Sequence, residues 1–196
     1  MSSSQIETRT RILQSSWKLL EANPPKGVRM SDIAKEASLS RQALYLHFPT
    51  RSEMLIATTL HVDDVLKMEE RLQSSREAKS GLERLNAYVE AWGNYIPEIY
   101  GVGRALMAVQ DTDEAAKIAW DGRMHALREG CLAAVKQLKQ DGDLLPELST
   151  KQATDMFWGL LSVRVWEHYI HDCKWSQKRY IDGTQQMAKR ILLGHT

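Results

Sequence analysis

The stretch DIAKEASLSRQALYLHFPTR, residues 32–51, decides the fold of this chain. Apolar residues recur three and four positions apart on both sides of Ser38-Leu39-Ser40, which is the pattern of two short amphipathic helices. We expect these helices at 30–37 and 41–47, with Ser40 as the N-cap of the second and Pro49 as its end. Two short helices joined by a tight turn, with a third helix packed behind them, make a helix-turn-helix.

The remainder of the chain has the same helical spacing of apolar residues and never alternates for long, so we expect helices throughout. Pro24-Pro25 end the first helix, a polar run at 74–80 ends the fourth, and Pro97 separates the fifth from the sixth. Thr112 is expected to cap the seventh. The predicted fold is all-α, without strands or repeats, and its nine helices lie at about residues 4–23, 30–37, 41–47, 51–73, 82–96, 99–109, 113–140, 151–171 and 177–193.

The composition is that of a globular protein. The 196 residues are 43% hydrophobic and 26% charged, and the chain is long enough to bury a core. No apolar run approaches the roughly 18–20 residues that cross a bilayer, and residues 1–11 lack the apolar segment of a signal peptide. Cys131 and Cys173 stand outside any CxxC or Cys/His cluster, which fits a reducing compartment. We therefore expect a cytoplasmic protein with no membrane partner.

Positive charge is concentrated at one end of the chain. Residues 1–51 hold eight Lys and Arg against four Asp and Glu, a net charge of +4, whereas residues 52–196 carry a net charge of −3. This asymmetry indicates a head that binds a polyanion, attached to a weakly acidic body.

Residues 32–51 strongly resemble the DNA-binding head of the TetR/AcrR family of transcription regulators. The resemblance covers about residues 5–60 at the level of motifs, and the rest of the chain only by helix count. It rests on Ile33-Ala34 ahead of Ala37, on Ser40 at the end of the turn, on the run Leu44-Tyr45-Leu46-His47-Phe48, and on a basic residue, Arg51, two positions after Pro49.

The resemblance implies a nine-helix architecture with two domains. Residues 1–50 would be the helix-turn-helix DNA-binding domain and residues 51–196 a helical domain for ligand binding and dimerisation, whose last two helices form a four-helix bundle with those of a second copy. The implied function is that of a ligand-responsive repressor that binds a palindromic operator as a homodimer. The implied partners are double-stranded DNA, a small-molecule effector and a second copy of the chain.

The predicted recognition helix begins with residue types that read DNA bases. Arg41 pairs in bidentate fashion with guanine and Gln42 with adenine, and each such pair is worth about 1–3 kcal/mol of discrimination against the wrong base. Ala43 and Leu46 suit contact with thymine methyl groups. Residues at the start of a recognition helix reach base edges in the major groove, so we assign base readout to these four positions.

A second group of residues is expected to bind the phosphate backbone. Tyr45 and His47 match family positions with this role, and Arg51 matches a position where the family usually has Lys. Ser31 is expected to cap the helix at 30–37 and to donate to a phosphate. The predicted DNA-binding set is therefore Ser31, Ser40, Arg41, Gln42, Ala43, Tyr45, Leu46, His47 and Arg51.

Two departures from the family pattern motivate an alternative function. Ser38 replaces a usual Gly in a turn that favours left-handed backbone, and Arg29 replaces a common Thr that would cap the next helix. A helical ligand-binding or scaffolding dimer that has lost DNA binding is the alternative. Against it, Tyr45, His47 and Arg51 are all present.

The body holds many large apolar side chains at helical spacing, a pattern more typical of a core than of a ligand site. An apolar cavity with a few polar groups is nevertheless the usual form of a small-molecule site. The predicted lining residues are Trp92, Tyr95, Met107, Trp120 and Met124. The last two helices carry apolar stripes with small residues among them, and the predicted dimer interface consists of Met156, Gly159, Leu160, Val163, Trp166, Tyr180, Thr184, Met187, Ala188 and Ile191.

Nothing in the sequence supports catalysis. There is no HExxH, GxSxG, phosphate-binding Gly loop or EF-hand pattern, and His168 with His171 lacks a clear third metal ligand. An all-helical enzyme would need such a constellation. We therefore expect no catalytic residue, no metal and no cofactor.

Overall fold

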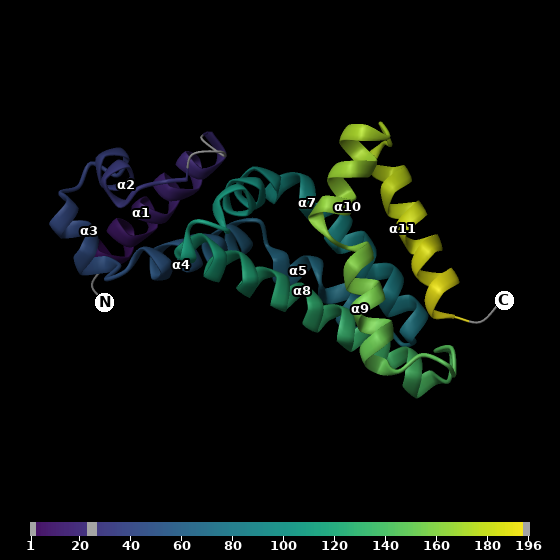
Figure 1. Cartoon of the computed structure of the whole chain (residues 1–196). Helices are drawn as coiled ribbons and strands as arrows, with labels where there is room; N and C mark the ends of the chain where they lie inside the picture. Colours follow the sequence, from purple (N-terminus) through teal and green to yellow (C-terminus); the bar gives the residue numbers. More distant parts are fainter. Residues whose placement is uncertain (1–2, 23–26, 194–196) are drawn as a thin grey trace. The chain divides into compact units, whose positions relative to one another are not determined.

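The computed structural model describes residues 3–22 and 27–193, and it confirms the all-α prediction. These residues form helices, turns and one isolated antiparallel bridge between Leu144 and Leu193. None of the helices described is both long and apolar enough to cross a membrane. The helices are α1 (Ser3–Ala22), α2 (Met30–Glu36), α3 (Arg41–His47), α4 (Arg51–Val65), α5 (Met68–Arg71), α6 (Gln73–Arg76), α7 (Gly81–Val109), α8 (Glu114–Asp141), α9 (Thr150–Leu160), α10 (Val163–Glu167), the π-helix η1 (His168–Asp172) and α11 (Gln177–Leu192) (Figure 1).

The chain divides into two compact units. The first unit consists of Met1–Leu66 and Ile99–Arg123, and the second of Lys67–Glu98 and Met124–Thr196. Helices α7 and α8 therefore each contribute one part to the first unit and another to the second. Residue 50, the predicted domain boundary, falls inside the first unit because α4 packs against α1. The division of function at that residue stays a prediction.

The first unit buries one apolar stripe from each of its short helices. Helix α2 buries Met30, Ile33 and Ala34, at the i, i+3, i+4 spacing of one helix face, and α3 buries Leu44. Between α1 and α4, the buried Thr58 hydroxyl donates to the Ser16 Oγ at 3.0 Å, so this contact leaves neither hydroxyl without a partner. The core fixes α2 and α3 while their opposite faces stay in solvent.

A side-chain cap marks the start of α3 but not that of α2. Ser40 is the N-cap of α3, as predicted, and its side chain accepts from the Ala43 N–H at 3.0 Å. Ser38 has φ 56°, so the turn does use the left-handed backbone that usually favours Gly. The predicted cap of α2 is wrong: Arg29 is the N-cap, with no side-chain hydrogen bond, and Ser31 lies inside the first turn.

Helix α7 runs through Pro97, where two helices were predicted. A proline removes one backbone donor and leaves the carbonyl four residues earlier, here that of Gly93, without its helical partner. The Gln177 side chain at the start of α11 donates to that carbonyl at 2.5 Å. A Cβ added to Gly93 would lie 2.6 Å from Ile181 Cγ1, so the absence of a side chain lets α11 come this close. A tertiary contact thus replaces the lost helical bond.

The helix predicted at 151–171 is interrupted instead, without any proline. Helix α9 ends at Leu160, Ser162 caps α10, and the π-helix η1 follows. The indole of Trp92 donates to the Leu161 carbonyl at 2.8 Å and so binds a backbone acceptor at the break. The fourth predicted helix is also shorter than expected, because α4 ends at Val65 and Lys67 adopts φ 56° ahead of the short α5 and α6.

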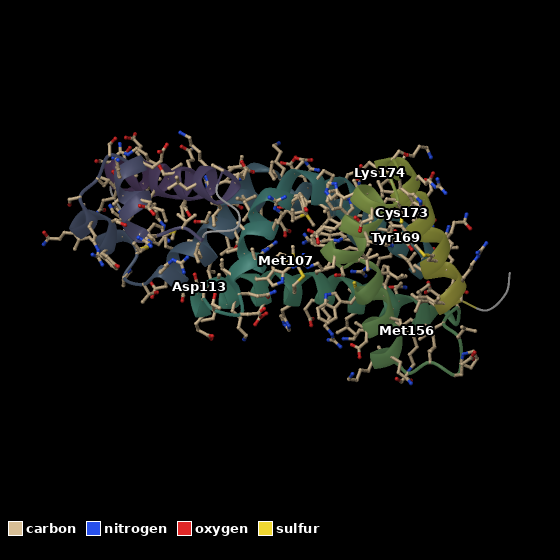
Figure 2. The ribbon with its side chains drawn as sticks, turned by 45° about the horizontal axis from the view of Figure 1, so that its top comes forward. Met107, Asp113, Met156, Tyr169, Cys173 and Lys174 are labelled. Atoms are coloured by element: carbon tan, nitrogen blue, oxygen red, sulfur yellow. The ribbon has the colours of Figure 1, made fainter. Side chains whose placement is uncertain are left out.

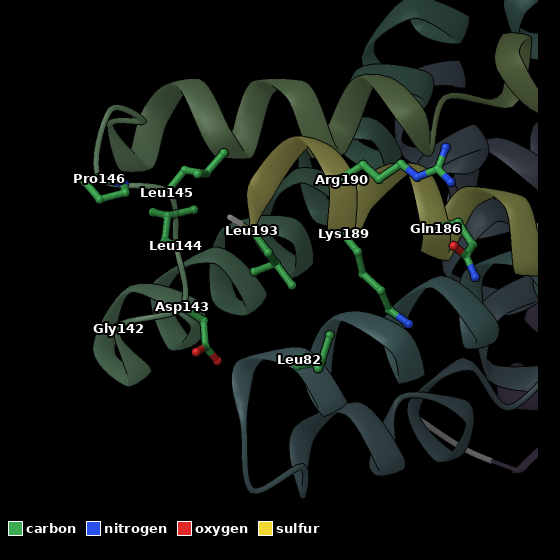
Figure 3. A pocket seen from close by; sticks show the side chains of 10 residues that line it. All are labelled: Leu82, Gly142, Asp143, Leu144, Leu145, Pro146, Gln186, Lys189, Arg190 and Leu193. Carbon is green, nitrogen blue, oxygen red and sulfur yellow. The ribbon is translucent and has the colours of Figure 1, made fainter. Parts of the chain in front are cut away.

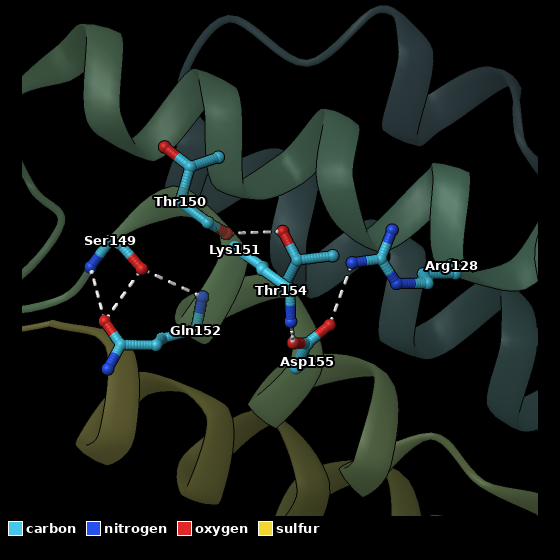
Figure 4. A network of polar contacts seen from close by, with 7 residues as sticks. All are labelled: Arg128, Ser149, Thr150, Lys151, Gln152, Thr154 and Asp155. Carbon is cyan, nitrogen blue, oxygen red and sulfur yellow. Dashed lines mark hydrogen bonds and ion pairs between the residues drawn. The ribbon is translucent and has the colours of Figure 1, made fainter.

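Polar contacts fix the start of α9 within the second unit (Figure 4). Ser149 and Gln152 form a capping box, in which each side chain binds the other's backbone N–H. Asp155 pairs with Lys151 on its own helix and with Arg128 on α8. Hydrogen bonds from Lys151 and then from Arg128 lower the pKa of Asp155. Helix α9 also contacts α11, so the network anchors α9 between α8 and α11.

Candidate nucleic-acid interface

One face of α3 is exposed, and it carries three of the four residues predicted to read bases together with Tyr45, which was predicted to bind phosphate. Arg41, Gln42, Tyr45 and Leu46 are all exposed, and Leu46 is 82% accessible, which is exceptional for a leucine. Their i, i+1, i+4, i+5 spacing puts them on one side of the helix, opposite the buried Leu44. The Arg41 guanidinium lies 5.5 Å from the centre of the Tyr45 ring. The face offers hydrogen-bonding, aromatic and apolar groups together.

The opposite side of α3 is tied to α1 through Arg9. The Arg9 Nη1 donates to the His47 carbonyl at 3.0 Å, where α3 ends and backbone acceptors lack helical donors. The same guanidinium lies 4.1 Å from the centre of the Phe48 ring. Arg9 was not among the predicted site residues, because nothing in the sequence shows which arginine reaches a carbonyl 38 positions away.

Several predicted residues meet around one hollow of about 520 Å³, which we call the head hollow. Ser31 from α2, Arg41 and Tyr45 from α3, and Arg51 from α4 line it. The other lining residues are Gly27, Val28, Arg29, Met30 and Asp113. Three arginines and two hydroxyl groups thus surround a space beside the exposed face of α3, which is a suitable arrangement for the oxygens of a phosphate group.

Arg51 is already engaged inside the head hollow. Its Nε donates to the Val28 carbonyl at 2.8 Å, and its Nη1 lies 2.5 Å from both carboxylate oxygens of Asp113. Asp113 lies between α7 and α8, and Figure 2 labels it. Its Oδ1 also accepts from the Ala116 N–H at 3.2 Å, so Asp113 caps α8 in place of the predicted Thr112.

The remaining predicted residues lie at the margins of the face. Ala43 and His47 are half-buried, and the Ser40 hydroxyl accepts the bond that caps α3. The structure therefore brings Ser31, Arg41, Tyr45 and Arg51 together at one hollow, and it leaves Ala43 and His47 outside the lining of that hollow.

Comparison with known proteins identifies this head. Residues 12–58 match the family model described as bacterial regulatory proteins, tetR family. This match makes the head of the chain, 47 of its 196 residues, similar to the tetR family. The match spans α2 and α3 and just over half of α1 and of α4. It includes the exposed face of α3 and eight of the nine residues that line the head hollow, all except Asp113.

Individual proteins are similar to the chain over different shares of its length. Nucleoid occlusion factor SlmA from Marinomonas sp. is 37% identical over 54 residues, which cover 28% of this chain and only 27% of that protein. SlmA from Idiomarina loihiensis is 24% identical over 72% of this chain and 70% of that protein. The crystal structure of the regulator FadR from Bacillus subtilis in complex with stearoyl-CoA shares the fold, with a TM-score of 0.73, 14% identity, and coverage of 92% of this chain and 97% of that one.

The residues predicted to line an effector pocket are divided between the two units. Trp92, Tyr95 and Met124 belong to the second unit, whereas Met107 and Trp120 belong to the first. All are buried except Met124, which is half-buried. Within the second unit the Trp92 and Tyr95 rings lie 6.1 Å apart. That these side chains line one cavity stays a prediction.

Half of the predicted dimer residues are already covered inside the second unit. Val163, Trp166, Tyr180, Thr184 and Ala188 are buried there. The others remain accessible: Met156 and Gly159 are exposed, and Leu160, Met187 and Ile191 are half-buried. A contact with a second copy would therefore fall on Met156, Gly159, Leu160, Met187 and Ile191.

A pocket of about 680 Å³ lies in the second unit, between the α8–α9 connection and the last turns of α11; we call it the tail pocket (Figure 3). Lys189 and Arg190 leave α11 there in different directions, and Asp143 stands on the α8–α9 connection. These charged residues accompany Leu82, Gly142, Leu144, Leu145, Pro146, Gln186 and Leu193.

The two cysteines differ in exposure. Cys131 is buried, and burial raises the pKa of its thiol. Cys173 is exposed in the turn before α11, with its Sγ 3.5 Å from the His168 Nε2 (Figure 2). In the described part of the chain, no group of three or more His, Cys, Asp and Glu side chains has the arrangement of a metal site.

Proposed function

We propose that the chain is a sequence-specific DNA-binding transcription regulator. One observation carries the proposal: the exposed face of α3, with Arg41, Gln42, Tyr45 and Leu46, lies beside a hollow lined by three arginines. Arg41 and Gln42 supply the donors that base edges in the major groove accept, and the hollow suits a backbone phosphate. The function is regulatory rather than catalytic.

The full proposal is a cytoplasmic homodimer that represses transcription from a palindromic operator. Two heads related by a two-fold axis read two half-sites, so the symmetry of the protein is repeated in the DNA. An effector bound in the body would favour a state in which the heads no longer match both half-sites. FadR from Bacillus subtilis was solved with stearoyl-CoA, which supports a small molecule as the effector class.

The DNA proposal is tested by selecting bound sequences from a random duplex library. We expect a palindromic winner, and Tyr45→Ala should weaken binding to all sequences alike, because phosphate contacts carry no sequence information. Arg41→Ala should relax the preference at one base position and cost about 1–3 kcal/mol. The control is Arg76→Ala, which removes the same charge from an exposed pair with Glu69 in the second unit. If no sequence is enriched, the proposal is wrong.

The dimer proposal is tested at Gly159, a helical position where an added Cβ would meet nothing within 4 Å. Gly159→Glu should leave the monomer fold intact, since replacing a helical Gly favours the helix by about 0.5–1 kcal/mol. It should nevertheless dissociate the dimer, because it puts a charge where two copies meet. Sedimentation equilibrium measures both masses. A variant that remains a dimer would place the interface elsewhere.

The alternative, a scaffolding or ligand-binding dimer without DNA binding, gains no support from the two sequence departures. Ser38 adopts the left-handed backbone that the turn requires. Arg29 is exposed and adds a cation to the lining of the head hollow. Neither change covers the face of α3 or removes one of its side chains.

A further inference from the structure

We propose that Asp113 is an internal competitor of DNA: its carboxylate occupies Arg51 and withholds that guanidinium from the backbone phosphate that the head hollow would otherwise bind. This inference rests on the proposed function and adds a form of regulation at the same site. The residue was not predicted from the sequence.

The geometry of Arg51 is that of a bound side chain. The Nη1 contacts both oxygens of Asp113 at 2.5 Å, and the Nε donates to the Val28 carbonyl at 2.8 Å. The side chains of Arg51 and Asp113 are only 24% and 23% accessible, so the pair is screened less by solvent than an exposed ion pair. The Asp113 carboxylate therefore neutralises part of the Arg51 charge, and the Nε and Nη1 donors are already occupied when no phosphate is bound.

Asp113 is itself held firmly in place. Its Oδ1 accepts from the Ala116 N–H and caps the 28-residue helix α8. A carboxylate at a helix N-terminus is stabilised by the partial positive charge of that terminus. Rotation of the Asp113 side chain away from Arg51 would sacrifice this cap. Arg51 is therefore released at less cost when its own side chain or the start of α4 moves away from the α7–α8 connection.

The charges that line the head hollow make the Asp113 carboxylate and a phosphate compete for Arg51. Arg29, Arg41 and Arg51 would together attract a phosphate, but Asp113 adds one negative charge to the same lining. That charge repels a phosphate and also neutralises the closest cation. A phosphate can replace the carboxylate as the partner of Arg51, since both offer paired oxygens to a guanidinium. Carboxylate and phosphate are thus rivals for one group.

The pair joins the DNA-binding surface to the part of the chain expected to sense an effector. Arg51 is the first residue of α4, and Asp113 directly precedes α8. Any state that draws the start of α8 away from α4 frees Arg51 for DNA, and any state that brings them together retains it. The α7–α8 connection is therefore a place where a ligand can change DNA affinity without touching the face of α3.

The test is a double-mutant cycle of Asp113→Asn and Arg51→Ala, measured on the selected duplex at several salt concentrations. Asparagine caps a helix about as well as aspartate, so Asp113→Asn removes the charge and keeps α8 intact. We expect it to raise DNA affinity about fivefold or more, within the usual range of allosteric coupling. The slope of log affinity against log salt should steepen by about 0.9, the value for one new phosphate contact. In the Arg51→Ala background both effects should disappear.

The matched control is Asp121→Asn, which makes the same charge change on α8 about two turns further along, at an exposed pair with Lys117. If Asp121→Asn raises affinity as much as Asp113→Asn, the effect is one of net charge and the proposal is overturned. The same holds if the gain from Asp113→Asn persists without Arg51. Lower or unchanged affinity of Asp113→Asn also overturns it, and lower affinity would make Asp113 a positioning residue.

Thermal unfolding confirms that each variant is folded, and Asp113→Ser, which retains an N-cap oxygen, replaces Asp113→Asn if the latter unfolds. Failure of the proposed function gives a different result. In that case the wild-type protein shows no saturable binding to any duplex, and Tyr45→Ala changes nothing. Wild-type binding that Tyr45→Ala weakens, together with no response to Asp113→Asn, overturns the competition alone.

Discussion

The head hollow and the tail pocket are similar in content and differ in how their charges are held. Each has cations, one aspartate and apolar neighbours in its lining. In the head hollow, Arg51 is fixed by Val28 and Asp113, and α2, α3 and α4 all supply lining side chains. In the tail pocket, the described contacts include no hydrogen bond or ion pair from the side chain of Lys189 or Arg190. Cations held in place by several helices form a binding site for an anion, whereas Lys189 and Arg190 mainly complement the C-terminal end of α11.

The largest loss of stability is expected at the buried side of α3, the helix that supplies Arg41 and Tyr45 to the head hollow. Leu44 is the fully buried residue of α3, so Leu44→Ala should destabilise the fold by about 2–5 kcal/mol and abolish DNA binding. Leu82→Ala, in the lining of the tail pocket, removes a side chain that is 36% accessible and should cost far less. Urea unfolding midpoints compare the two. Equal losses would mean that the tail pocket is as firmly built as the head hollow.

The next effect tests whether Arg9 on α1 positions α3 for DNA binding. Arg9→Ala removes a charged donor from the His47 carbonyl and a cation from the Phe48 ring, so DNA affinity should fall about tenfold, or about 1.4 kcal/mol. The salt dependence should not change, because Arg9 positions α3 and does not contact phosphate. Fluorescence anisotropy at several salt concentrations measures both quantities, with the exposed Arg11→Ala as control. A shallower slope for Arg9→Ala would instead make Arg9 a phosphate ligand.

The next smaller effect is the dependence of stability on pH, which we expect to arise in the first unit and not in the second. The His61 Nε2 is buried in the first unit with no hydrogen-bond partner among the described residues, and burial lowers the pKa of His61 although Asp64 opposes the shift. The folded protein therefore favours the neutral ring, so its stability is complete above the unfolded pKa of about 6.5 and declines as pH falls below that value.

Melting temperatures at pH 7.5 and 5.5 measure this contribution, and His61→Gln should reduce the loss on acidification. His125→Gln, at an exposed histidine of the second unit, provides the comparison. An identical acid response in wild type and His61→Gln would exclude His61 as its source.

The smallest effect is expected in the tail pocket. Replacing Lys189 and Arg190 together by Gln should leave DNA affinity unchanged and alter stability by only about 0.5 kcal/mol, since the two cations complement the C-terminal end of α11. Isothermal calorimetry and thermal unfolding measure these outcomes. A large loss of DNA affinity would show that the two regions are not as different as their contacts indicate.

Local patterns were sufficient to predict the head. The spacing of Ile33, Ala34 and Leu44 gives the buried faces of α2 and α3, and Ser40 caps α3 as a serine ahead of a helical pattern should. The exposed face of α3 follows from the same helical spacing, since the positions opposite the buried Leu44 must face solvent. These features depend only on neighbours within a few residues.

Features that depend on distant partners could not be predicted in this way. Pro97 leaves α7 continuous because Gln177 satisfies the freed carbonyl, and α9 stops at Leu160 although no proline or glycine follows at once. Asp113 was missed as the partner of Arg51 for the same reason, because 62 positions separate them. The sequence signal is slight: Asp113 lies one residue before a helix and next to Thr112, the predicted cap.

The bond from Gln177 to the Gly93 carbonyl has a consequence for the order of assembly. During synthesis, α7 is complete when residue 109 has emerged, yet the donor for its unsatisfied carbonyl is added 68 residues later. Until α11 docks, only water can bind that carbonyl, and α7 is free to bend at Pro97. A chain truncated before α11 should therefore bend more readily at Pro97 than the complete chain does, because it lacks the donor for the Gly93 carbonyl.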